Sequence, residues 1–173
     1  AYARLHGAKH IAMTDGTDTT EATLTAVHRF VRRRVYAGTK AFIGASVGSF
    51  ALYRSYGIPD EKMFQSHLCA NNDAFVGQNN VRGKRYDFVF SARFVPGKNP
   101  LFALEVAQAV AQRLGRKVSI LLLGSGEMID EMRQAAEAMR TDVDATFAGF
   151  VKQADLPALY ASASVLLFPT QLD

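Results

Sequence analysis

The feature that most constrains the fold is the regular alternation of strand-like and helix-like segments after residue 85. Short apolar runs that are typical of buried strands cover residues 86–92, 117–123, 143–147 and 165–168. Segments with a helical pattern lie between them, at residues 99–114, 126–139 and 154–163. Because strands that alternate with helices at this spacing form parallel sheets with helical crossovers, we expect an α/β fold that contains half of a doubly wound sheet.

The first part of the chain, residues 8–75, alternates in the same way but less regularly. We expect strands at residues 8–14, 41–45 and 62–68 and helices at residues 21–37 and 46–56. In the first helix, Val27, Val31 and Val35 recur at helical spacing, which predicts that they face the core and that the neighbouring arginines face outward. Residues 70–85 are rich in Asn, Gly and basic residues and have no apolar periodicity, which predicts a linker.

The composition narrows the class of protein. With 49% apolar and 21% charged residues, the chain is typical of a globular protein, and disordered or collagen-like chains are excluded. The one cysteine, Cys69, excludes an internal disulfide and a cysteine-based zinc site, and it favours a reducing compartment. No apolar run approaches the ~20 residues that a membrane-spanning helix needs.

Charge is distributed unevenly along the chain. Residues 1–86 carry 12 Lys and Arg against 6 Asp and Glu, a net charge of +6, whereas residues 87–173 carry 8 against 10, a net charge of −2. Part of the basic excess is the arginine run at residues 29–34. It is consistent with a surface that meets anionic lipid head groups or phosphate, but the pattern favours a solvated helix face together with a polar linker. Nucleic acid fits less well, because no aromatic stacking pattern accompanies the arginines.

Candidate site residues follow the expected strands of the second part. In an open α/β sheet, ligands bind at the carboxyl ends of the strands. Arg93 and Lys98 follow the first of these strands, and two cations beside a helix N-terminus suit a diphosphate; the alternative is two exposed basic residues on a loop. Gly124 and Gly126 follow the second strand, where glycines let the backbone approach a ligand. The dinucleotide fingerprint is not met, because Ile129 stands where a small residue is required.

The motifs occur in a characteristic order. They are Ala92-Arg93-Phe94-Val95-Pro96-Gly97-Lys98-Asn99, then Gly124-Ser125-Gly126, Gly149-Phe150-Val151, Leu159 with Tyr160 and Ala163, and Pro169-Thr170. This order resembles the first half of the nucleotide-sugar-binding domain of retaining glycosyltransferases of the GT-B architecture, most of all glycosyltransferase family 4, also called the group 1 type. Residues 1–75 resemble, less specifically, the end of the acceptor domain of the same enzymes, and residues 76–85 the linker between the two domains.

The resemblance implies a function and roles for particular residues. The activity would be transfer of a sugar, of the hexosyltransferase type and with retention, from a nucleotide-diphosphate donor to a glycan, lipid or polysaccharide-precursor acceptor. Arg93 and Lys98 would be catalytic and would bind the donor diphosphate, together with Gly124 and Gly126. Phe150 and Val151 would contact the nucleobase. Asp173 would stand at the first acid of the family's E-x7-E motif and would contact the donor sugar. The resemblance implies no cofactor and no metal.

The resemblance also implies a context for the chain. The second acid of the E-x7-E motif would lie beyond Asp173, so the chain is expected to be an internal part of a longer enzyme and inactive alone. The expected partners are a UDP-, GDP- or similar nucleotide-sugar, a glycan or lipid-linked acceptor and, by peripheral contact, an anionic membrane; nucleic acid is not expected as a partner. The expected location is the cytoplasm, including the inner face of the membrane. A nucleotide-sugar epimerase, a phosphorylase of the same fold and a non-catalytic binding module remain open alternatives.

Overall fold

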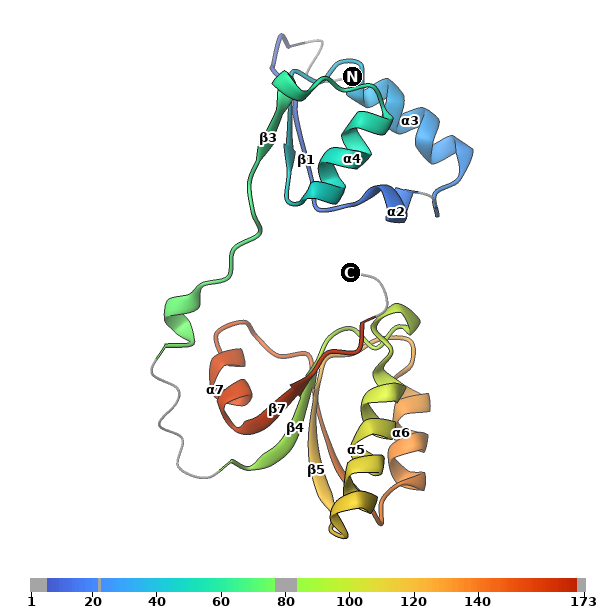
Figure 1. Ribbon diagram of the computed structural model, residues 1–173, viewed down its shortest axis with the longest axis vertical. Coiled ribbons are helices and arrows are strands. Elements are labelled where there is room, and N and C mark those ends of the chain that lie inside the picture. Colours follow the sequence, from blue (N-terminus) through green and yellow to red (C-terminus); the bar gives the residue numbers. More distant parts are fainter. Residues whose placement is uncertain (1–5, 22, 77–83, 171–173) are drawn as a thin grey trace. The chain divides into compact units, whose positions relative to one another are not determined.

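A computed structural model describes residues 6–21, 23–76 and 84–170 (Figure 1). The contacts within the chain divide it into two compact units, Ala1–Ala70 and Asn71–Asp173, called unit 1 and unit 2 below. Each unit contains a parallel sheet whose strands are joined by helices, as the alternation of segments predicts. None of the helices within the described ranges is long and apolar enough to cross a membrane.

Unit 2 is built on a four-stranded parallel sheet with the order β6-β5-β4-β7. Its strands are β4 (Tyr86–Ser91), β5 (Val118–Leu123), β6 (Val143–Gly149) and β7 (Ala163–Leu167). Its helices are α5 (Pro100–Leu114), α6 (Ile129–Ala138) and α7 (Leu156–Ala161). The strand order places β4 and β5 at the centre of the sheet, so the loops that follow them lie beside each other at its carboxyl edge.

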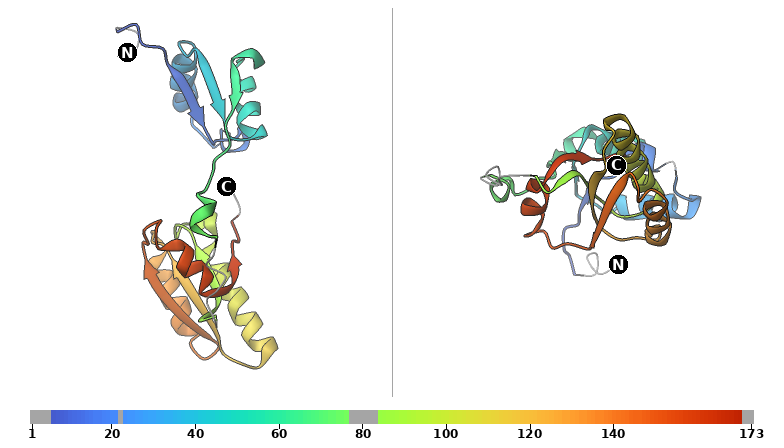
Figure 2. Two further views of the ribbon diagram at one scale, coloured as in Figure 1. Left: turned by 90° about the vertical axis from the view of Figure 1, so that its left-hand side faces the viewer. Right: turned by 90° about the horizontal axis from the view of Figure 1, so that it is seen from below.

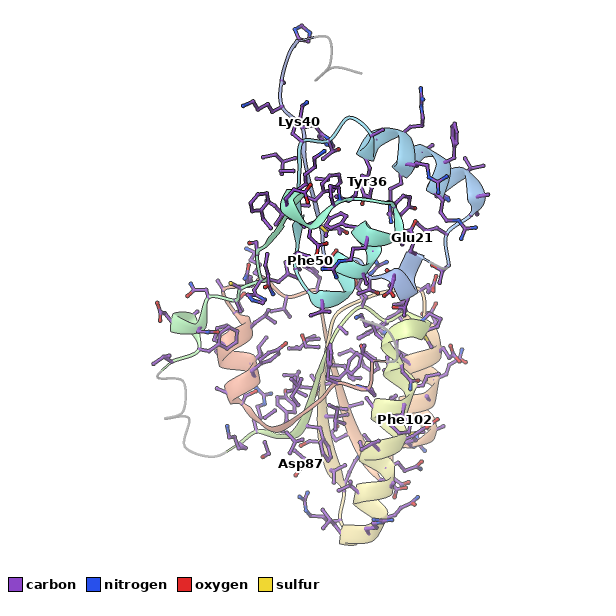
Figure 3. The ribbon with its side chains drawn as sticks, turned by 45° about the horizontal axis from the view of Figure 1, so that its top comes forward. Glu21, Tyr36, Lys40, Phe50, Asp87 and Phe102 are labelled. Atoms are coloured by element: carbon purple, nitrogen blue, oxygen red, sulfur yellow. The ribbon has the colours of Figure 1, made fainter. Side chains whose placement is uncertain are left out.

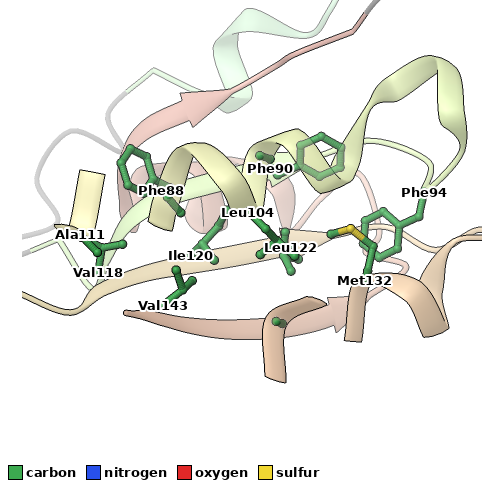
Figure 4. Packing of buried hydrophobic residues seen from close by; sticks show 13 residues of the cluster. Phe88, Phe90, Phe94, Leu104, Ala111, Val118, Ile120, Leu122, Met132 and Val143 are labelled. Carbon is green, nitrogen blue, oxygen red and sulfur yellow. The ribbon is translucent and has the colours of Figure 1, made fainter. Parts of the chain in front are cut away.

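The core of unit 2 is almost entirely apolar. Helices α5 and α6 cover one face of the sheet, and α7 covers the other (Figure 1). Phe90, Leu104, Ile120 and Met132 are fully buried between the sheet and the helices (Figure 4). Burial of each such side chain contributes about 1.5–3 kcal/mol, so this layer stabilises the unit substantially.

At the edge of this sheet where the strands begin, the side chain of Asp87 links the first residues of β4 and β5 (Figure 3). Its carboxylate accepts hydrogen bonds from both terminal nitrogens of Arg116, at 3.2 and 2.7 Å, and from the Ser119 N–H at 2.8 Å. These donors, the Arg116 guanidinium first, lower the pKa of Asp87 from 3.8 to about 2.

Unit 1 contains a three-stranded parallel sheet with the order β1-β2-β3. The strands are β1 (Ile11–Thr14), β2 (Ala41–Gly44) and β3 (Met63–Gln65), and the helices are α2 (Asp18–Glu21), α3 (Ala26–Tyr36) and α4 (Val47–Ser55). Helices α3 and α4 lie on the same face of this sheet (Figure 2). A short 3-10 helix, Asp60–Lys62, leads into β3.

Aromatic rings form much of the core of unit 1. The rings of Phe42 and Tyr53 meet edge to face with centroids 5.0 Å apart, and Tyr36 meets Phe42 at 5.1 Å. The Tyr53 hydroxyl donates a hydrogen bond to the Ile43 carbonyl at 2.8 Å. Burial raises the pKa of Tyr53 to about 12. The polar end of the Tyr53 ring therefore takes part in the packing that holds unit 1 together.

The rotation of α3 differs from the sequence-based prediction. Val27, Val31 and Val35 point outward, with exposed fractions of 70%, 54% and 47%, and Arg32 points inward. Arg32 forms an ion pair with Glu21, which is only 7% exposed and also accepts a hydrogen bond from the Tyr56 hydroxyl. A buried carboxylate needs such partners, so Glu21 selects the face of α3 that turns inward. The predicted helix at residues 21–37 is also divided, because Thr25 caps a separate helix.

The segment between the two sheets contains a 3-10 turn, η2 (Asn72–Ala74). The ring of Phe75 then packs against Tyr160 of α7, with ring centroids 6.0 Å apart, so this turn belongs with unit 2. The predicted linker at residues 76–85 falls mostly on residues 77–83, which lie outside the described residues.

Candidate functional site

Backbone hydrogen bonds connect the three loops that follow β4, β5 and β6. The Phe94 N–H donates to the Ser125 carbonyl at 3.0 Å, and the Met128 N–H donates to the Phe94 carbonyl at 3.1 Å. The Gly124 N–H donates to the Gly149 carbonyl at 2.8 Å. The carboxyl edge of the sheet is therefore a connected frame rather than a set of independent loops.

The side chain of Phe94 anchors the loop after β4 in the core of unit 2. It follows β4 in a loop, yet it is fully buried, and its ring lies 6.0 Å from Phe90 and 6.4 Å from Phe147 between ring centroids. Figure 4 shows it beside Met132 at the end of the core. Sequence reasoning missed this role; an aromatic residue next to an arginine in a short turn was the available signal.

The two glycines after β5 are required by the packing of these loops. Gly124 has φ +136°, and a Cβ there would overlap the Ala92 carbonyl oxygen. A Cβ on Gly126 would overlap the Phe94 carbonyl oxygen and lie 2.7 Å from the Phe94 carbonyl carbon. The glycine pair therefore lets the loop after β5 lie directly against the loop after β4, whatever ligand the edge binds.

A pocket of about 220 Å³ opens where the three loops meet. It is lined by Ser91, Ala92, Arg93, Leu123, Gly124, Ser125, Phe150, Val151 and Leu156. Among these residues Arg93 alone is charged, and its side chain is exposed. Val151 and Leu156 pack against the apolar cluster on the α7 face of the sheet, so they give the pocket an apolar wall. An arginine facing an apolar wall suits a ligand that has both an anionic and a flat apolar part.

The structure gathers four of the predicted site residues around this pocket: Arg93, Gly124, Phe150 and Val151. Phe150 is 84% exposed, so its ring stands in solvent, whereas Val151 is half-buried. Gly126 does not line the pocket; it packs against the backbone of Phe94. Asp173 lies outside the described residues.

Lys98 lies on the side of this loop that faces β7. It ends the 3-10 turn η4 (Pro96–Lys98), is half-buried, and its ammonium nitrogen stands 5.8 Å from the centroid of the Phe168 ring. The next residue, Asn99, has φ 48° and passes the chain to Pro100 at the start of α5. Lys98 and Arg93 are therefore presented by one loop, with Arg93 at the pocket and Lys98 beside the end of β7.

Fold and site together define a Rossmann-like α/β unit, in which a parallel sheet with crossover helices carries a pocket with an arginine at its carboxyl edge. A model of the family "Glycosyl transferases group 1" matches residues 71–173, and the chain belongs to this family. The matched range coincides with unit 2.

Several solved structures are similar to nearly the whole chain. HepE from Anabaena, solved in complex with UDP and glucose, has a TM-score of 0.74 and 15% identity over 98% of this chain and 48% of that chain. TarM from S. aureus has a TM-score of 0.70 and 12% identity over 95% and 32%. The pneumococcal O-GlcNAc transferase GtfA, in complex with UDP and GlcNAc, has a TM-score of 0.69 and 11% identity over 96% and 34%.

The chain thus spans about half the length of HepE and about a third of TarM and GtfA. The prediction of an α/β fold of the GT-B type, with parallel sheets and helical crossovers, is confirmed. A search of the curated proteins finds no match to this chain.

Proposed function

We propose that the protein is a glycosyltransferase that moves a sugar from a UDP-sugar to a glycan or lipid-linked acceptor with retention of configuration. The observation that carries the proposal is the pocket at the carboxyl edge of unit 2, with Arg93 at its opening, in a chain of the group 1 family. UDP as the nucleotide is supported by HepE and GtfA, both of which were solved with UDP.

Arg93 is proposed to bind the donor diphosphate. It lines the pocket and is exposed, so its guanidinium is accessible to a phosphate that enters. A guanidinium binds phosphate through two parallel hydrogen bonds, and this contact strengthens as negative charge develops on the departing UDP. Arg93 would therefore contribute both to donor binding and to the rate of transfer.

Lys98 is proposed to supply the second positive charge. The Phe168 ring beside its ammonium and the short turn before it restrict where that charge can lie. Two cations from one loop can balance a leaving diphosphate, and we therefore propose that transfer needs neither a metal ion nor a cofactor. Transfer that is unchanged after treatment with a chelator would agree with this; loss of transfer that Mg²⁺ or Mn²⁺ restores would contradict it.

The nucleobase is proposed to lie against Val151, with Phe150 beside it. Val151 and Leu156 form the apolar wall of the pocket, which suits the face of a uracil ring. Gly124 and Gly126 hold the neighbouring loop close enough for its backbone to meet the diphosphate. Asp173 is proposed to contact the donor sugar.

The cellular compartment is proposed from the state of the one cysteine. Cys69 is a free, exposed thiol, which is typical of proteins in a reducing compartment. We therefore propose that the enzyme works in the cytoplasm, where it would build polysaccharide or lipid-linked precursors.

Calorimetric titration with UDP tests the donor site. Arg93→Ala is expected to weaken UDP binding about 10- to 100-fold, because a hydrogen bond to a charged group contributes about 1.5–3 kcal/mol. Arg113→Ala is the matched control, since Arg113 is an exposed arginine in the last turn of α5 and lies outside the pocket lining. Equal affinity in the wild type and the Arg93 variant would contradict the assignment.

Product analysis separates the reaction classes. A transferase joins the sugar to the acceptor and releases UDP, an epimerase returns an altered UDP-sugar without an acceptor, and a phosphorylase requires inorganic phosphate. The anomeric configuration of the product, read by NMR, tests retention. Inversion would contradict this part of the proposal.

A further inference from the structure

A second pocket, of about 210 Å³, lies between strand β6 and helix α6 of unit 2 and is called the β6–α6 groove below. On the strand side it is lined by Val143, Ala145 and Phe147, which alternate along β6 and all pack on the α6 side of the sheet. On the helix side Arg133 and Glu137 are four residues apart and therefore share one side of α6. The groove thus follows both elements, and it shares no lining residue with the pocket at the carboxyl edge.

Strand β6 lies at the edge of the sheet, and one side of its backbone is open. The sheet order β6-β5-β4-β7 gives it β5 as its sole neighbour among the described strands. The Val118 N–H donates to the Asp142 carbonyl at 2.9 Å, so Asp142 and every second residue up to Thr146 direct their backbone groups to β5. Ala145 and Phe147 direct theirs outward, and no described residue bonds to them. Such groups can pair with a further strand.

The form of β6 favours this pairing. With seven residues it is the longest of the described strands, and it contains neither Lys nor Pro, the residues that commonly protect an edge. Its bulge lies at its carboxyl end, opposite Leu122 and Leu123, so the strand is regular before it. Alternation turns the exposed Asp144 side chain to the face of the sheet away from α6. The stretch beside the groove can therefore accept a partner strand.

The charged side chains along the groove leave an excess of positive charge. Arg140 is paired with Glu137 at 2.7 Å, whereas Arg133 and Lys117 form no ion pair with any described residue. The guanidinium carbon of Arg133 stands 5.6 Å from the centroid of the Phe147 ring. A guanidinium held over a ring keeps N–H groups free to bind a carboxylate. The groove therefore offers two cations to acidic groups.

Open backbone groups and unpaired cations together select one occupant. An extended segment would bond to Ala145 and Phe147 through its backbone, and every second side chain of it would enter the groove. Acidic side chains at those positions would meet Arg133 and Lys117. A second copy of β6, paired antiparallel, would bring the same cations towards each other, which charge repulsion opposes. We propose that the β6–α6 groove binds an extended acidic segment of a partner protein, which adds to β6 as a further strand.

Binding of a synthetic peptide to the whole chain tests this proposal. The probe is a peptide as long as β6, made of alternating Glu and Val with blocked ends, and in the matched peptide Lys replaces each Glu. We expect the Glu peptide to bind, as read by fluorescence anisotropy, and the Lys peptide to bind at least about tenfold more weakly. Hydrogen exchange at the amides of Ala145 and Phe147 should slow about tenfold in the complex, because both N–H groups become bonded.

Substitutions separate the two kinds of contact. Arg133→Gln should weaken binding of the Glu peptide about tenfold and Lys117→Gln about threefold, because each removes a charged partner. Ala145→Pro keeps the cations but removes an outward N–H, and should also weaken binding about tenfold; an edge strand tolerates proline where the N–H faces outward, and the melting temperature without peptide checks this. Arg113→Gln is the matched control, because Arg113 is exposed on α5 outside the groove, and it should bind as the wild type does.

Three results would overturn the proposal. The first is no binding of the Glu peptide, or equal binding of both peptides. The second is binding without slower exchange at Ala145 and Phe147, which would mean that the groove holds anions without strand addition. The third is a dimer in solution that Ala145→Pro dissociates, which would mean that a second copy occupies β6. The proposal does not depend on the transferase activity: UDP affinity of Arg133→Gln should match the wild type, so failure at the donor site and failure at the groove are read separately.

Discussion

The sheet of unit 2 is covered by helices on both faces, whereas the described helices of unit 1 cover only one face of its sheet. Ile11 and Met13, on the other face of that sheet, have exposed fractions of 56% and 59%. The core of unit 2 is filled by aliphatic and phenylalanine side chains, while that of unit 1 contains tyrosines and a carboxylate paired with arginine. The comparison shows that the loops of unit 2 rest on an apolar core and are joined by backbone hydrogen bonds, whereas side-chain polar contacts orient the helices of unit 1.

The largest expected effect comes from disturbing the packing of the loops in unit 2, and it tests whether this packing holds unit 2 independently of unit 1. Gly126→Ala places a methyl group against the Phe94 backbone, and we expect it to lower the free energy of unfolding of unit 2 by about 3 kcal/mol. Amide hydrogen exchange in β5 measures this for unit 2 alone. Exchange in β2 of unit 1 should be unchanged.

Gly97→Ala is the matched control for that substitution. Gly97 lies in the same group of loops, but a Cβ there would have nothing within 4 Å. Its effect should stay within about 0.5 kcal/mol. If both variants exchange like the wild type, the close approach of the two loops does not exist in solution.

Unit 2 is also expected to lose stability in acid, because it contains the Asp87 carboxylate with its lowered pKa. The folded pKa of Asp87, about 2, lies below its ordinary value of 3.8, so its stabilising effect is present above about pH 4 and is lost as the pH falls towards 2. After allowance for solvent screening, we expect unit 2 to lose about 1–2 kcal/mol over this range. Asp87→Asn should remove that loss, as measured by urea denaturation at each pH.

Asp60→Asn provides the control for the acid experiment. Asp60 forms a similar two-bonded pair with Arg54, but both side chains are largely exposed. It should leave the acid dependence of unit 2 unchanged. An acid loss in unit 2 that persists in Asp87→Asn would show that other groups cause it.

The smallest expected effect concerns the tyrosines of unit 1. Tyr53→Phe removes the hydrogen bond to the Ile43 carbonyl and should cost about 1 kcal/mol at neutral pH. Because the folded pKa of Tyr53, about 12, exceeds its ordinary value of 10.0, wild-type unit 1 should lose stability as the pH rises from 10 towards 12. Tyr53→Phe should show a smaller alkaline loss.

Tyr86→Phe in unit 2 is the comparison for that variant. Within the described part of the chain, the Tyr86 hydroxyl makes no hydrogen bond, so its removal should change stability by less than about 0.5 kcal/mol. Equal losses in the two variants would mean that the Tyr53 hydroxyl contributes nothing specific to unit 1.

The sequence predicts unit 2 better than unit 1 for a physical reason. Apolar runs mark β4 and β5 to within one or two residues, and the rule that ligands bind at carboxyl ends brings Arg93 and Gly124 to the pocket. The rotation of α3 could not be predicted, because periodicity does not show that Glu21 is buried and requires Arg32. The burial of Phe94 and the place of Lys98 beside Phe168 depend on contacts between loops, which local patterns do not encode.

An NMR titration of the chain with UDP tests the central claim most directly. We predict chemical-shift changes at the amides of Arg93, Gly124 and Val151, which lie in the three loops around the pocket, and none in β1 or α3 of unit 1. The same concentration of UDP should produce far smaller changes in Arg93→Ala. Changes confined to unit 1, or changes in unit 2 that survive unaltered in Arg93→Ala, would contradict the assignment of this pocket to the nucleotide-sugar donor.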